Sequence, residues 1–73
     1  MRRVPPDGII LPVLTPRETE VLQRITAGQS TSTMASEMNV TTETLRSYVK
    51  NVLAKLGARS RVEAAALAGR YGI

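Results

Sequence analysis

The residues best suited to binding chemistry are hydrogen-bond donors within the segment 39–56, NVTTETLRSYVKNVLAKL. Arg46, Ser47 and Lys50 are separated by steps of one and three residues, so a helix would place them on one side. That side carries little negative charge, although Glu43 lies one turn upstream. Guanidinium, hydroxyl and ammonium groups all donate hydrogen bonds. The pattern therefore predicts a surface that recognises an acceptor-rich, negatively charged partner.

Catalysis has little support in the sequence. The chain has no cysteine and no histidine, so the nucleophile–base pairs that recur in hydrolases and the common zinc sites are missing. Glu18 and Glu20 are two residues apart and would point to different helix faces, which rules them out as a paired-carboxylate site. We therefore predict that the protein is not an enzyme and holds no catalytic residue, metal or other cofactor.

The charge is distributed unevenly along the chain. The net charge is +4, with six basic residues and one acidic residue from position 46 onward. Positions 14–45 hold two basic and four acidic residues. Such asymmetry suits an anionic polymer that docks on one face. The plain alternative is a solvated basic surface that only aids solubility.

Length and hydropathy limit the class of protein further. A chain of 73 residues makes one domain at most. It has no apolar run close to the roughly 20 residues needed to span a bilayer, so we expect no membrane partner. The apolar stretch 9–14 is interrupted by Pro12 and is too short for a signal-peptide core. The absence of cysteine is compatible with a reducing cytoplasm, which is the location we expect.

The chain divides into an N-terminal arm or linker, residues 1–13, and a helical domain, residues 14–73. Proline and glycine at positions 5–8 favour a turn or extended backbone in the arm. The first helix of the domain begins at a capping box, Thr15-Pro16-Arg17-Glu18, and Gly28 ends it. Its buried stripe is Val21, Leu22 and Ile25.

Three further helices follow at short intervals. Ser30 caps a short second helix, and Asn39 suits the left-handed turn that follows it. A third helix runs from its cap, Thr41, to a left-handed Gly57. Its buried side is Leu45, Val49, Val52, Leu53 and Leu56. A second capping box, residues 60–63, opens an alanine-rich fourth helix that ends near residue 70. The fold class predicted is all-α, a four-helix domain containing a helix-turn-helix, with a short extended N-terminal arm.

Three stretches, LTPRETEVLQRITAG, STSTMA and VTTETLRSYVKNVLAKLGARSRVEAA, carry a resemblance. Together they are similar to the C-terminal DNA-binding domain of the LuxR/FixJ/GerE family of bacterial transcription regulators, from Leu14 to about Ala68. The resemblance implies a domain whose third helix enters the major groove of double-stranded DNA. It also implies a homodimer formed through the fourth helix. Many members are output domains of response regulators, and RNA polymerase is a further candidate partner in transcription regulation.

The family's base-reading positions match Arg46, Ser47 and Lys50. Arginine and lysine can donate to guanine O6 and N7, and serine can donate or accept. Glu43 has two open readings, because it can accept from a cytosine amine or only favour the helix N-terminus. Candidates for phosphate contact are Thr31, Thr44, Asn51, Lys55, Arg59 and Arg61. For both threonines the alternative is local capping, and for Arg61 it is a surface ion pair.

The dimer surface predicted on the fourth helix is Val62, Ala65, Ala66 and Gly69. The alternative is that its small residues only pack on the first and third helices. A different function also remains open, namely a protein-interaction module of the same shape that uses AAALAG and IILPVL. The donor-rich third helix argues against this as the main role.

The sequence departs from the family pattern at several positions. Thr31, Ser32 and Thr33 stand where the family commonly has Asn-Lys-Glu, so the second helix lacks a capping glutamate and a phosphate-facing lysine. Asn39 replaces the usual turn glycine. Tyr48 stands where histidine is frequent, and its hydroxyl can reach a phosphate or its ring can shield the core edge.

Overall fold

The computed structural model describes residues 14–71, which form four helices with no strand between them. They are α1 (Pro16–Thr26), α2 (Thr31–Glu37), α3 (Thr42–Leu56) and α4 (Arg61–Tyr71). This confirms the predicted all-α class and the order of its helices. The predicted arm at residues 1–13 lies outside the described residues, as do positions 72–73 of the predicted domain.

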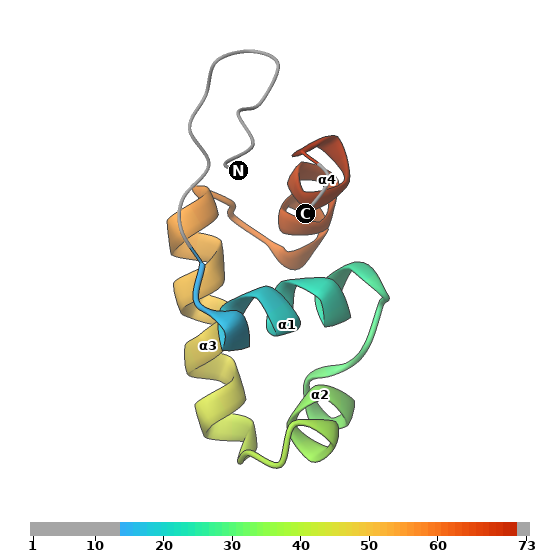
Figure 1. Ribbon diagram of the computed structural model, residues 1–73, viewed down its shortest axis with the longest axis vertical. Coiled ribbons are helices and arrows are strands. Elements are labelled where there is room, and N and C mark those ends of the chain that lie inside the picture. Colours follow the sequence, from blue (N-terminus) through green and yellow to red (C-terminus); the bar gives the residue numbers. More distant parts are fainter. Residues whose placement is uncertain (1–13, 72–73) are drawn as a thin grey trace.

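The other three helices lie on the same side of α3, which is the longest (Figure 1). α1 lies across α3 near its middle and packs against both α3 and α4. α2 packs against α3 at the end where the chain turns from α2 into α3. One long side of α3 is therefore left without a helix of residues 14–71 over it.

Three of the helices begin as their capping residues predict. The Glu18 N–H donates to Thr15 Oγ1 at 3.1 Å, and the Thr15 N–H donates to Glu18 Oε1 at 2.9 Å, which completes the capping box of α1. Ser30 Oγ accepts from the backbone of α2 at 3.2 Å, and Thr41 Oγ1 from that of α3 at 3.1 Å. Each bond satisfies an N–H that the helix leaves without an internal partner.

The start of α4 differs in one bond from the predicted capping box. The Glu63 N–H donates to Ser60 Oγ at 3.1 Å, as expected. The Glu63 carboxylate, however, accepts from the N–H of Arg59 at 2.8 Å instead of from that of Ser60. The chain bends at residues 59 and 60, and this bend brings the earlier N–H to the carboxylate.

The turns that the sequence marked adopt left-handed backbone. Asn39 has φ 57°, Gly57 has φ 68° and Gly28 has φ 79°. Asparagine tolerates this region better than most residues, and glycine adopts it without a steric cost. Asn39 lets the chain reverse between α2 and α3 within four residues. This short connection fixes the two helices as a helix-turn-helix.

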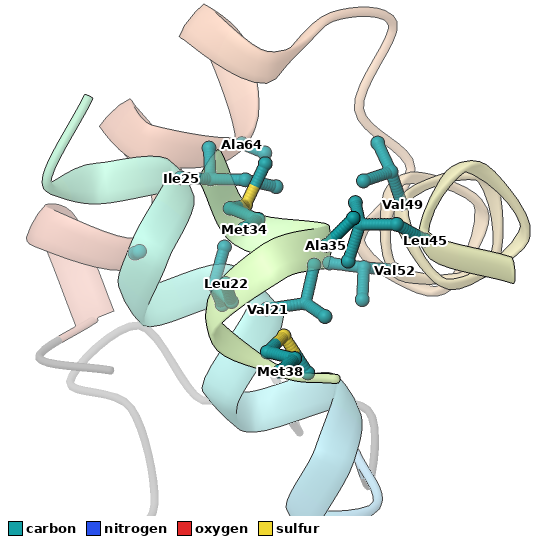
Figure 2. Packing of buried hydrophobic residues seen from close by; sticks show 11 residues of the cluster. Val21, Leu22, Ile25, Met34, Ala35, Met38, Leu45, Val49, Val52 and Ala64 are labelled. Atoms are coloured by element: carbon teal, nitrogen blue, oxygen red, sulfur yellow. The ribbon is translucent and has the colours of Figure 1, made fainter. Parts of the chain in front are cut away.

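The core draws on all four helices (Figure 2). Its buried members are Val21, Leu22, Ile25, Met34, Ala35, Met38, Leu45, Val49, Val52, Ala64 and Ala68. The stripe predicted for α1 is buried throughout. In α3, Leu53 and Leu56 are only half-buried at the edge of this cluster.

Candidate nucleic-acid interface

The side of α3 that faces away from the core carries Glu43, Arg46, Ser47 and Lys50, which we name the donor face. All four residues are exposed. The opposite side of the helix, with Leu45 among its residues, is held in the core. Within residues 14–71, the donor-face side chains make no hydrogen bond or ion pair, so their polar groups are available to a ligand.

The size of α3 fits a DNA groove. An α-helix with side chains is about 10–12 Å across, close to the roughly 12 Å width of the major groove. From Glu43 to Lys50 the helix rises about 10 Å, which corresponds to about three base pairs at 3.4 Å each. The donor face could thus span a short run of bases.

One flank of the donor face carries Thr44, Tyr48 and Asn51, which differ in exposure and in local contacts. Thr44 and Asn51 are both exposed. The Thr41 hydroxyl donates to Thr44 Oγ1 at 3.0 Å, so Thr44 has the local role considered as its alternative. Its own hydroxyl proton can still be donated outward. Tyr48 is half-buried and packs against the core, which agrees with the edge-shielding role.

Lys55 has a strong partner within the protein. Its Nζ donates to Glu18 Oε1 at 2.7 Å, across 37 positions of sequence. The Glu18 side chain is only 8% exposed. The hydrogen bond from Lys55, and after it that from the Thr15 backbone, lowers the pKa of the Glu18 carboxyl below its usual value of 4.5. Lys55 therefore ties the end of α3 to the start of α1, a role that sequence reasoning missed.

Two of the predicted phosphate-contacting residues meet in the structure. The Arg61 guanidinium, at the start of α4, donates to the hydroxyl of Thr31, at the start of α2. Arg61 is half-buried and makes this contact instead of the surface ion pair considered as its alternative. Arg59 is exposed in the loop between α3 and α4.

The outer side of α4 is small, apolar and solvent-facing. Val62 is 80% exposed, Ala66 and Gly69 are exposed, and Ala65 is half-buried. The inner side packs on the core through other alanines of the helix. Next to Val62 is an open hollow of about 370 Å³. It is lined by Ile25, Gly28, Gln29, Arg61, Val62 and Ala65.

Two properties of residues 14–71 bear on membrane and metal binding. Over that range, no helix combines the length and apolar character needed to cross a bilayer. Nor does the described part contain a group of three or more acidic, histidine or cysteine side chains that could hold a metal ion.

A short helix, a tight turn and a longer helix with a free donor face together define a helix-turn-helix DNA-binding domain. Comparison with known proteins gives the family. The family model described as "Bacterial regulatory proteins, luxR family" matches residues 12–68. The chain belongs to this family, as its sequence motifs indicated, and it is a DNA-binding domain of the type found in transcription regulators.

Individual relatives agree with this assignment. The chain is 43% identical over 61 residues to the probable transcriptional regulatory protein NarL of Mycobacterium tuberculosis, covering 84% of this chain and 28% of NarL. It is 42% identical over 55 residues to the nitrate/nitrite response regulator protein NarP of Escherichia coli, covering 75% and 26%. It is 41% identical over 73 residues to the HTH-type transcriptional activator RamA of Corynebacterium glutamicum, covering 90% and 26%.

The chain thus spans little more than a quarter of each of these relatives. The names of the relatives describe regulators of transcription. The family match and these relatives indicate a regulator and not an enzyme, in agreement with the sequence.

Proposed function

We propose that the chain binds specific sequences of double-stranded DNA with α3 in the major groove. The observation that carries this proposal is the donor face, whose side chains are exposed and make no hydrogen bond or ion pair within residues 14–71. Arg46 reads a guanine through its two-pronged guanidinium, and Ser47 and Lys50 read neighbouring bases. Glu43 accepts from a cytosine amine or supports the helix N-terminus.

Phosphate contacts set the register of the domain on the duplex. We assign them to exposed or half-exposed polar groups around the donor face, namely Thr31, Thr44, Asn51, Lys55, Arg59 and Arg61. Thr31 and Arg61 can hold one phosphate together, because their side chains already touch. Lys55 can reach a phosphate only by sharing its ammonium with Glu18 or by leaving it.

The test of specificity is selection of bound duplexes from a random pool, followed by comparison of Arg46→Ala with the parent chain. Loss of one bidentate base contact costs roughly 1–3 kcal/mol on the selected site and relaxes the preference at one position. Gln23→Ala, on the exposed side of α1, is the matched control. Equal losses on selected and random DNA would contradict base reading by Arg46.

We further propose that two chains pair through the outer side of α4, using Val62, Ala65, Ala66 and Gly69. Small side chains allow two helices to approach closely, and the exposed valine supplies apolar area. Pairing lets two donor faces bind half-sites roughly one helical turn apart. Sedimentation on a duplex with two half-sites should show two chains bound together. One chain per duplex at saturation would reject the dimer.

The wider role follows from the named relatives, among them a response regulator and a transcriptional activator. We propose that the chain acts in bacterial transcription regulation in the cytoplasm, with RNA polymerase as a further partner. A gel shift at low salt separates this role from that of a pure protein-interaction module. Binding of a protein without any shift of duplex DNA would favour the module.

A further inference from the structure

One guanidinium joins three parts of the helix-turn-helix region. Arg24, on α1, donates to Glu20 Oε2 from Nη2 at 3.1 Å and from Nε at 3.3 Å. Its Nη1 donates to Gln29 Oε1 at 3.1 Å and also to Glu37 Oε1. The Arg24 side chain is only 22% exposed. It therefore links α1, the α1–α2 loop and the last residue of α2.

A second arginine reaches the same end of α2. Arg17 Nη1 donates to Glu20 Oε1 at 3.3 Å, and its Nη2 donates to the carbonyl of Met38 at 3.1 Å. Met38 is the C-cap residue that follows α2. Gln29 Nε2 also donates to Glu37 Oε1, at 3.3 Å. We name the set Arg17, Glu20, Arg24, Gln29 and Glu37 the α1–α2 clasp.

The clasp adds polar bonds to the apolar contacts of α2, whose residues Met34, Ala35 and Met38 are buried in the core. α1 and α2 are not among the closely packed helix pairs, whereas α2 packs well on α3. α2 has only seven residues, many of them hydroxylated, and such a short helix depends on tertiary contacts. Isolated surface ion pairs stabilise little, but several charges in one network are the recognised exception. The clasp therefore supplements the apolar core in holding the C-terminal end of α2 against α1.

We propose that Arg24 and Glu37 are positioning residues for DNA binding. They hold the C-terminal end of α2 at a fixed position on α1. Because the turn between α2 and α3 is short, the position of α2 also fixes that of α3 and its donor face. The proposal rests on the proposed function. Within the described residues, both side chains are bound to protein groups, so neither needs to touch DNA to affect affinity.

Replacing Glu37 gives a test in which electrostatics and positioning predict opposite changes in DNA affinity. Replacing an acid removes repulsion from phosphates, so Glu37→Met should tighten DNA binding if charge alone mattered. Positioning predicts that Glu37→Met weakens binding to a selected duplex, by roughly three- to tenfold. Glu37→Gln removes the same charge but keeps an acceptor oxygen for Arg24, so it should stay within about twofold of the parent chain. Ser36→Met, an exposed neighbour on α2, controls for the added side chain.

Arg24 can be distinguished from a phosphate contact by salt. A residue that neutralises a phosphate contributes about 0.9 to the slope of log affinity against log salt. We expect Arg24→Met to weaken binding roughly three- to tenfold with an unchanged slope. Lys50→Met serves as the comparison for a basic residue on the donor face. A smaller slope for Arg24→Met would overturn its positioning role. All titrations are run at a temperature where circular dichroism shows every variant fully folded.

Hydrogen exchange on the free chain tests the clasp without DNA. Glu37→Met should speed exchange of the α2 amides and leave those of α3 close to the parent chain, while Glu37→Gln should restore the parent pattern. If the parent chain bound no duplex, the proposed function would fail, and the exchange data would still judge the clasp. Unchanged α2 exchange in Glu37→Met, or binding as tight as the parent or tighter, overturns the proposal.

Discussion

Leu45 anchors the start of α3, and its truncation is the sharpest test of how the core supports the donor face. Its side chain is 0% exposed and belongs to the cluster that includes residues of all four helices. Leu45→Ala removes buried methyl groups and leaves a cavity, at a cost of roughly 2–5 kcal/mol. Leu53→Ala is the matched control, because Leu53 lies on the same helix but only half-buried.

The cost is large compared with the stability of so small a chain. At about 0.05–0.15 kcal/mol per residue, a chain of 73 residues has roughly 4–11 kcal/mol in total. Each kcal/mol shifts the Tm of a domain this size by about 4–8 °C. We therefore expect Leu45→Ala to lower the Tm by roughly 10 °C or more. The shift for Leu53→Ala should be less than half as large.

Urea unfolding followed by circular dichroism measures both variants. A change in the midpoint without a change in slope identifies a loss of stability alone. If Leu45→Ala lowered the free energy of unfolding by no more than Leu53→Ala does, Leu45 would not be the buried anchor of α3 that the structure indicates. DNA affinity should then be measured at urea concentrations well below the transition, where each variant is folded. A loss of affinity under these conditions reports a change in the donor face and not a smaller folded fraction.

Other perturbations address the ends of α3 and the outer side of α4. The pKa of Glu18 is lowered, so the stability that its carboxylate contributes is complete above about pH 4.5 and is lost as the pH falls through the lowered pKa. Lys55→Met should reduce the Tm at neutral pH. It should also reduce the loss of stability on acidification. Gly57→Ala places a Cβ at φ 68° and should cost about 1–2 kcal/mol in urea unfolding, without changing contacts elsewhere. Val62→Asp should shift the Tm of the free chain by no more than about 4 °C, since the side chain is exposed, but should abolish pairing on a two-site duplex. Retained pairing would place the dimer surface elsewhere.

Most of the fold could be predicted because its signals are local. Thr15, Ser30 and Thr41 each lie next to the helix that they cap, and the buried stripes repeat within single helices. The exposure of Arg46 and Lys50 followed from the same periodicity, since a residue opposite a buried stripe faces out. Asn39 was identified as left-handed from its residue type and its place after a short helix.

The contacts that could not be predicted join residues far apart in the sequence. Lys55 meets Glu18 across 37 positions, and Arg24 meets Glu37 across 13. No periodicity or cap motif relates such pairs, because their approach depends on how the helices pack. The hydrogen bond that the Glu63 carboxylate accepts could not be predicted either, although its partner is close in the sequence. A bend at residues 59 and 60 decided which N–H its carboxylate accepts.

The structure divides seven of the positive charges in residues 14–71 into two groups that composition cannot separate. Four of them, Arg17, Arg24, Lys55 and Arg61, donate to other protein groups and hold helices together. The side chains of Arg46, Lys50 and Arg59 make no hydrogen bond or ion pair within residues 14–71, and they lie on the donor face or just beyond α3. The salt dependence of DNA binding should therefore follow the second group more closely than the net charge. In this domain, Arg17 and Arg24 hold helices together, Arg46 and Lys50 are proposed to meet the nucleic acid, and Lys55 and Arg61 are proposed to do both.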